Sequence, residues 1–210
     1  MMAHIPLRLL NIITLAFSLL ALSGCVNLGG GTQQTTKFYV LNSLYSARGD
    51  IVAERTTDET IIGVGPVKLP EYVNRPQIIT RTSNNELEVA SFARWAESLE
   101  SNLSRVVAEN LTVLLSTDRV LVYPWKGTVT VDYQVALEVT RFDGVLGGPV
   151  SMRARWTVLG DNGKELLSRK LSSRSTQADA DNYQALVAAQ SKMLADLSSE
   201  IADEIKALSR

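Results

Sequence analysis

The sequence predicts an α+β fold: an antiparallel or mixed sheet that carries two long amphipathic helices on one face, in a single domain. Apolar residues recur at three- and four-residue spacing over 94–116 and again over 181–208, which is typical of helices with one buried face. Apolar and polar residues alternate strictly over 129–140 and 150–158, which is typical of strands with one buried face. The order of strands, helix, strands, helix favours a layered arrangement.

The chain begins with a secretory signal that ends in a cysteine. Arg8 precedes an apolar run over 9–22, and about 14 residues suit a signal peptide but not a bilayer span, which takes roughly 20. Leu22-Ser23-Gly24-Cys25 matches the bacterial lipobox. We therefore expect residues 1–24 to be removed as a lipoprotein signal peptide. The alternative is a fortuitous cysteine after an ordinary signal peptide.

Cys25 is then the first residue of the mature protein, with a covalent diacylglycerol on its thiol and an acyl chain on its amine. These chains exceed the two signals that stable membrane anchoring needs. Residues 25–36 are rich in Gly, Thr and Gln, which predicts a flexible tether between the lipid and a domain at 37–210. The mature protein is expected to be tethered to a membrane without crossing it.

The composition excludes most familiar active sites from that domain. The chain has one histidine, His4, and one cysteine, Cys25, so residues 37–210 contain neither. This excludes Ser-His-Asp and Cys-His nucleophiles, His/Cys zinc sites and disulfides. Carboxylate pairs, Ser-Lys dyads and oxygen-ligated metals stay open, but no spacing singles one out. We expect no catalysis, no metal site and no cofactor beyond the lipid.

The charge balance also limits the partners. The chain carries 21 basic and 22 acidic residues, so nothing indicates a polyanionic partner such as nucleic acid.

In the first half of the domain we expect four strands with a proline-rich turn at 70–76. They lie at 37–42, 60–69, 77–81 and 86–90, and the last two form a hairpin around Asn84-Asn85. Gly63, Gly65 and Pro66 interrupt the second strand, and proline there favours a sheet edge or a bulge.

In the second half, the helix over 94–116 is followed by a short strand over 120–123 and by the two alternating strands. Glu138 and Asp132 are expected to face Arg153 and Arg155 across those strands. Asp161-Asn162-Gly163 predicts a turn into a strand over 164–173, and Asp181 is expected to cap the final helix.

Several short segments together resemble the family of ABC-type transport auxiliary lipoproteins, most closely its paraquat-inducible branch. The segments are Phe38-Tyr39-Val40-Leu41, residues 62–67, Leu69-Pro70-Glu71-Tyr72, Arg75-Pro76-Gln77-Ile78, residues 92–97, residues 99–103 and Val122-Tyr123-Pro124-Trp125. They span nearly the whole mature domain and keep the family's order after a lipobox.

The resemblance implies a non-catalytic subunit of an MCE-type intermembrane lipid transport system, with an MCE-domain periplasmic protein and its inner-membrane partner as binding partners. Such a subunit docks the periplasmic conduit against the outer membrane. Val26-Asn27 lacks the aspartate that retains lipoproteins at the inner membrane, so we expect attachment to the periplasmic face of the outer membrane. A ring-like homo-oligomer would match the symmetry of a conduit.

Two other functions stay open: a periplasmic carrier module that binds lipid or solute in a large apolar pocket, and an envelope enzyme that uses carboxylates or a Ser-Lys pair.

Five residues are candidate partner contacts. Val145 and Leu146 occupy a Gly-rich tip at 143–149, where we expect little core for them to reach. Pro66, Pro70 and Tyr72 belong to a candidate docking edge, for which the alternative is a purely structural role of the Gly/Pro backbone. Trp95 and Trp125 are expected to be core or packing aromatics rather than lipid contacts.

Overall fold

The computed structural model describes residues 34–44 and 59–209. Cys25, the signal peptide, the tether before Gln34 and most of the predicted loop at 46–59 lie outside these residues. The described elements are β1 Lys37–Tyr39, β2 Ile62–Lys68, β3 Gln77–Ser83, β4 Glu86–Trp95, α3 Leu99–Leu115, β5 Val120–Val122, β6 Tyr133–Gly144, β7 Pro149–Gly160, a short 3-10 turn Asp161–Gly163, β8 Glu165–Gln177 and α4 Tyr183–Leu208.

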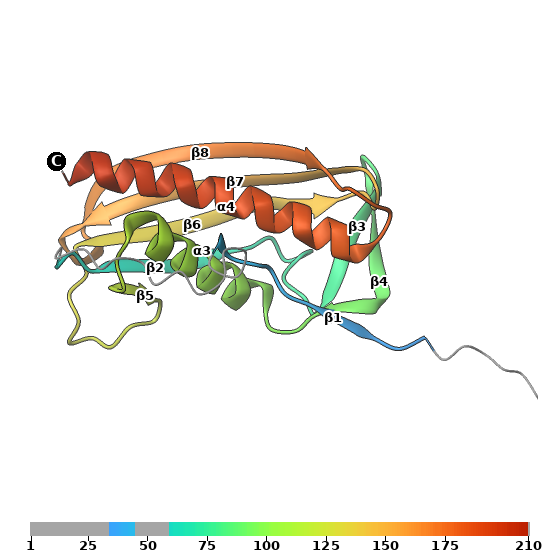
Figure 1. The fold of residues 1–210 in the computed structure, drawn as a ribbon, viewed down its shortest axis with the longest axis horizontal. Coiled ribbons are helices and arrows are strands. Elements are labelled where there is room, and N and C mark those ends of the chain that lie inside the picture. Colours follow the sequence, from blue (N-terminus) through green and yellow to red (C-terminus); the bar gives the residue numbers. More distant parts are fainter. Residues whose placement is uncertain (1–33, 45–58, 210) are drawn as a thin grey trace, which may run out of the picture. The chain divides into compact units, whose positions relative to one another are not determined.

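The strands form two sheets rather than one. A three-stranded sheet has the order β1-β4-β3, and a five-stranded sheet has the order β5-β2-β6-β7-β8. Both are mixed, because β1 pairs parallel to β4 and β2 pairs parallel to β5 and β6, while the remaining pairs are antiparallel. Helix α3 contacts β2 and β5, and α4 contacts β6, β7 and β8, so both helices cover one face of the five-stranded sheet (Figure 1). The predicted α+β class is confirmed.

The long hairpin of β6 and β7 follows the alternation seen in the sequence, and the register pairs Glu138 with Arg155, whose side chains form an ion pair at 2.7 Å. However, β6 begins at Tyr133 rather than at 129 and extends to Gly144. A register shift between Val139 and Arg141 changes which side chains face inward, so Phe142 and Asp143 are both buried.

Both helices begin later than predicted. Strand β4 continues to Trp95, so α3 starts at Leu99, where the side chain of Ser98 accepts a hydrogen bond from the Ser101 amide. The cap of α4 is Asn182, which accepts from the Ala185 amide, and not Asp181. Neither helix is both long and apolar enough to cross a membrane.

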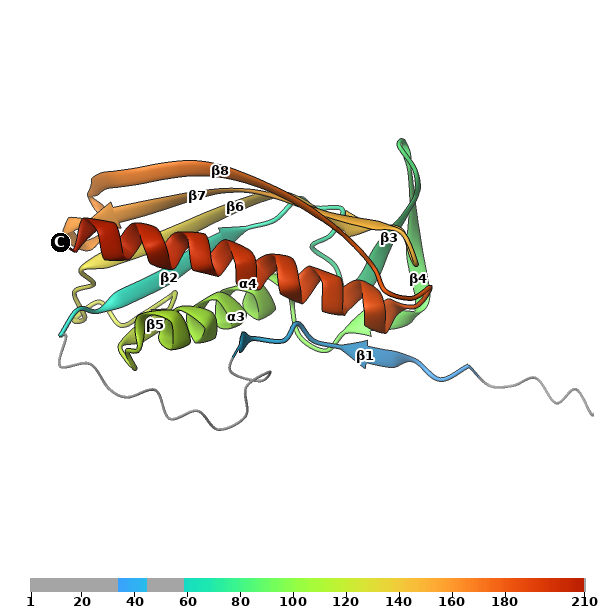
Figure 2. The ribbon, with the colours of Figure 1, turned by 45° about the horizontal axis from the view of Figure 1, so that its top comes forward.

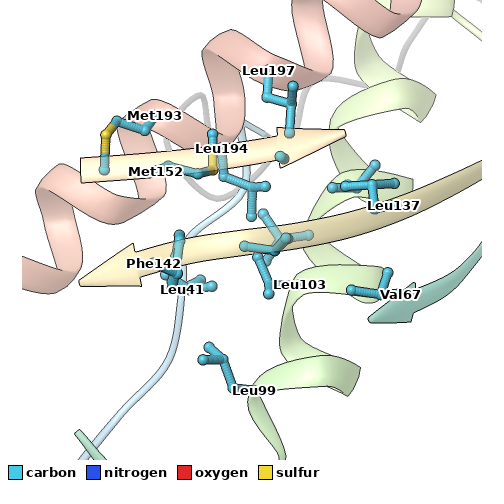
Figure 3. Packing of buried hydrophobic residues seen from close by; sticks show 14 of the residues in the cluster. Leu41, Val67, Leu99, Leu103, Leu137, Phe142, Met152, Met193, Leu194 and Leu197 are labelled. Atoms are coloured by element: carbon cyan, nitrogen blue, oxygen red, sulfur yellow. The ribbon is translucent and has the colours of Figure 1, made fainter. Parts of the chain in front are cut away.

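The main core lies between the helices and the five-stranded sheet. Leu103 from α3 and Leu194 and Leu197 from α4 meet Leu137 and Met152 from the sheet (Figure 3). Each fully buried side chain of this size contributes roughly 1.5–3 kcal/mol relative to exposure.

The segment after β1 is held between the two helices by buried amide and hydroxyl groups. The Leu41 amide donates to Asn102 Oδ1 of α3 at 3.0 Å, and the Asn42 amide donates to Ser191 Oγ of α4 at 3.0 Å. The Leu44 amide donates to Asn110 Oδ1 at 2.7 Å. Asn110 in turn donates to Ser198 Oγ at 3.1 Å and so joins α3 to α4. No local pattern in the sequence predicts these contacts.

Candidate functional site: the exposed faces of the two sheets

A buried carboxylate connects the two sheets. Asp143, near the end of β6, has a fully buried side chain. It accepts hydrogen bonds from Arg81 Nε at 3.0 Å and Nη2 at 3.0 Å, and from the Tyr72 hydroxyl at 2.8 Å. Arg141 Nε donates to the same carboxylate at 3.1 Å. Because Arg81 belongs to β3 and Asp143 to β6, this cluster fixes the three-stranded sheet against the five-stranded sheet.

The cluster keeps Asp143 ionised and Tyr72 neutral. Burial by itself would raise the pKa of Asp143, but the hydrogen bonds from Arg81 and Tyr72 and the positive charges of Arg141 and Arg81 hold this pKa below its usual value. Burial and the hydrogen bond to Asp143 raise the pKa of Tyr72 to about 12. Tyr72, Arg81 and Arg141 all donate hydrogen bonds to Asp143, which indicates that the cluster has a structural role in joining the two sheets.

The other face of the five-stranded sheet is open to solvent in the described part of the chain, because both helices lie on the opposite face (Figure 2). A groove of about 350 Å³ runs across β2, β6, β7 and β8 on this outer face. Its charged lining is Lys68, Arg155 and Arg169 against Glu138, so the groove is net basic.

One end of the outer face is covered by two aromatic residues. Trp125 lies against Gly63, where an added Cβ would come within 2.7 Å of the indole ring. Gly65 has a φ of +122°, and a Cβ there would come within 2.6 Å of Tyr123. Tyr123 and Trp125 pack edge to face with ring centroids 5.4 Å apart. Glycine is therefore required at both positions, because the aromatic side chains approach the backbone of β2 too closely for a side chain there. Trp125 is a packing aromatic, as expected. Trp95 also lies in the core, as expected.

The predicted partner contacts are not brought together. Pro66 is exposed, lies at a register shift of β2 against β6 and lines the basic groove. The expected interruption of this strand is thus present as a bulge. Pro70 is half-buried in the following turn, and Tyr72 belongs to the Asp143 cluster. A partner contact of Pro66, Pro70 or Tyr72 stays a prediction.

At the Gly-rich tip, the expectation that apolar side chains find little core is wrong for Leu146. This residue packs on the main core, and Val145 is also half-buried. The tip folds back on the end of β8, where the Ala178 amide donates to the Gly148 carbonyl at 2.9 Å and Gln177 Nε2 to the Gly147 carbonyl at 2.8 Å. A partner contact there stays a prediction.

A second exposed surface was missed by sequence reasoning. Phe38 is 64% exposed on β1, Val40 follows β1 at 43%, and Phe92 on β4 is 46% exposed. Tyr39 and Trp95, which are paired in register, point inward. The sequence signal for this surface is that Phe38 and Val40 would lie on one side of a strand and Tyr39 on the other. All three side chains are apolar or aromatic, and a three-residue strand is too short to indicate which side is buried.

Within residues 34–44 and 59–209, no three side chains among His, Cys, Asp and Glu are placed to hold a metal ion.

The comparisons with known proteins agree with this architecture. Among solved structures, an uncharacterized protein superposes with a TM-score of 0.66 at 21% identity, covering 81% of this chain and 99% of its own. Protein XCC0632 from Xanthomonas campestris gives a TM-score of 0.58 at 16% identity, covering 79% and 92%. At these identities the likeness concerns the fold. No curated protein matches the sequence. The family described as "ABC-type transport auxiliary lipoprotein component" matches residues 39–202, and the chain therefore belongs to this family.

Proposed function

We propose that this chain is a non-catalytic lipoprotein subunit of an MCE-type intermembrane lipid transport system, anchored to the periplasmic face of the outer membrane through Cys25. The observation that carries the proposal is the family match over 39–202, which makes the chain an auxiliary component of a transport system. Its partners are an MCE-domain periplasmic protein and that protein's inner-membrane partner. A homo-oligomer would present several copies to a symmetric conduit.

The basic groove is the surface that we assign to the protein partner. Three cationic side chains and Pro66 border a concave surface on a sheet face that no described helix covers. Arg155 and Glu138 are both about half exposed, so their ion pair contributes little to folding and can be exchanged for contacts with an acidic segment of a partner.

Co-purification tests the groove directly. The double variant Arg155→Glu with Arg169→Glu reverses two charges of the groove, and Lys192→Glu on the exposed side of α4 is a matched control. We expect the double variant to lose most of the MCE partner recovered from detergent-solubilised membranes, while Lys192→Glu retains it. Equal recovery with both variants would reject the groove, and the absence of an MCE protein from every preparation would reject the proposed function.

Labelling with radioactive palmitate tests the anchor. The precursor with Cys25 should incorporate palmitate and sediment with the outer membrane, and Cys25→Ser should do neither. Incorporation that persists in Cys25→Ser, or a wild-type product that begins at another residue, would contradict lipidation at this site.

A carrier role has less support. A carrier needs a large apolar pocket, and the space between the helices and the sheet is filled by side chains such as Leu103, Leu137 and Leu194 (Figure 3). Native mass spectrometry of the purified protein distinguishes the roles, because bound phospholipid at a fixed stoichiometry would favour the carrier.

A further inference from the structure

The exposed apolar side chains of this protein are concentrated on one sheet. Nine large apolar side chains are exposed in the described part of the chain, and five of them belong to β4, to β1 or to the residue just after β1. They are Phe38, Val40, Leu87, Val89 and Phe92. We call Phe38, Val40 and Phe92 the β1–β4 patch, because they lie among or next to the paired residues of these two strands.

The register shows that Phe38 and Phe92 lie on one face. Phe38 pairs with Arg94, and Tyr39 pairs with Trp95. Phe92 and Arg94 alternate with the buried Ala93 and Trp95, so both lie on the outward side of β4. Because register partners in a parallel pair share a face, Phe38, Arg94 and Phe92 lie on the same outward face of the two strands.

The charged side chain beside Phe38 on the outward face is basic. Arg94 lies opposite Phe38 on the outward face, whereas Lys37 pairs with the buried Ala93 and belongs to the other face of β1. The two glutamates of β4 lie in its other half: Glu86 accepts from the Thr82 hydroxyl near the hairpin turn, and Glu88 pairs with Thr80. Aromatic and aliphatic side chains beside a cationic residue are typical of surfaces that lie at a phospholipid interface.

The place of the patch along the chain brings one possible occupant, the anchoring membrane, within reach. Cys25 precedes Phe38 by 13 residues, and a chain of that length spans at most about 45 Å. We propose that the β1–β4 patch lies on the phospholipid surface to which Cys25 is anchored, with Phe38 and Phe92 at the acyl boundary and Arg94 at the phosphates. This inference rests on the anchor in the proposed function. A two-fold contact with a second copy is less favourable, because it would bring Arg94 of the two chains together without a counter-charge.

The test holds the protein at a membrane without using its own lipid. The mature chain, with a hexahistidine tag before Val26 in place of Cys25, is bound to phosphatidylethanolamine/phosphatidylglycerol vesicles that contain a nickel-chelating lipid. Cys25 is the only cysteine of the chain, so Val40→Cys or Leu171→Cys then provides a single thiol for an environment-sensitive fluorophore. Leu171 is the matched control, because it is 62% exposed on β8, away from the patch.

We expect emission at position 40 to rise about threefold when vesicles are added and emission at position 171 to stay unchanged. Phe38→Ser with Phe92→Ser should remove most of the rise at position 40. Leu166→Ser with Leu171→Ser, which also removes two exposed apolar side chains, should not.

Three results would overturn the inference: equal responses at positions 40 and 171, a response at position 40 that survives the double Phe substitution, or a rise with protein concentration in the absence of vesicles, which would indicate self-association. The artificial tether makes the assay independent of acylation at Cys25 and of any MCE partner. A failure of the patch can therefore be distinguished from a failure of the proposed function.

Discussion

The outer face of the five-stranded sheet and the β1–β4 patch are both exposed, but they differ in chemistry. The first is a concave, net basic groove with an ion pair and a proline at its border. The second is a set of exposed aromatic and aliphatic side chains beside Arg94. Charged grooves favour polar segments of proteins, and aromatic patches beside cations favour lipid surfaces. Under the two proposals, one domain holds two binding surfaces, and the Asp143 cluster joins the sheets that carry them.

Breaking that cluster should have the largest effect. Asp143→Ala leaves Arg81, Arg141 and the Tyr72 hydroxyl without their common acceptor. We expect the free energy of unfolding to fall by about 3 kcal/mol, at the lower end of the range for buried ion pairs because both arginines reach solvent. Urea denaturation measures this. A loss below about 1 kcal/mol would show that the sheets are held together by packing alone.

The same cluster should make stability depend on pH in the alkaline range. Because the folded state raises the pKa of Tyr72 to about 12, the folded form retains a proton that the unfolded form loses near its ordinary pKa of about 10. The stabilisation is complete below about pH 10 and is lost between about pH 10 and 12, by about 1–2 kcal/mol for this half-buried group. Urea midpoints of wild type and Tyr72→Phe should therefore converge over this range. Parallel curves would contradict the assignment.

A smaller effect is expected where aromatic residues cover one end of the outer face. Gly63→Ala places a methyl group against the ring of Trp125, and displacement of the ring should cost about 1–2 kcal/mol. Trp fluorescence should report the greater exposure of the indole. Gly127→Ala is a suitable control, because an added Cβ there meets nothing within 4 Å.

The smallest effects on stability are expected from the two binding surfaces. Phe38→Ser with Phe92→Ser, and Arg155→Glu with Arg169→Glu, replace exposed side chains, so each double variant should change the free energy of unfolding by less than about 1 kcal/mol. Thermal melting checks this. Small changes would assign any loss of membrane or partner contact to binding. A large loss of stability in either variant would instead give that surface a structural role.

The parts of the fold that depend on local pattern could be predicted from the sequence. The alternation in β6 and β7 placed Val135, Leu137 and Trp156 on the buried face, and the spacing of leucines located both helices. The helix starts could not be placed correctly. Nothing local distinguishes Trp95 as the end of a strand that pairs with β1 from Trp95 as the first turn of a helix.

Most of the candidate surfaces depended on contacts between distant segments. Pro66 was placed correctly at an interruption, because the Gly/Pro pattern itself indicates one. The groove could not be predicted, since its basic residues come from β2, β7 and β8 and meet only through the sheet order. Burial of Asp143 depends on the register shift near Val139, which breaks the alternation on which the prediction rested.

The hold of α3 and α4 on the segment after β1 has a mechanical consequence. If Cys25 is the anchor, any tension between the membrane and the transporter enters the domain through β1 and the residues that follow. Side chains from both helices hold the backbone of Leu41, Asn42 and Leu44. A pull on the anchor therefore loads the edge strand β1 first, and the two helices together hold the backbone directly behind it, so that separation of β1 need not spread into the core.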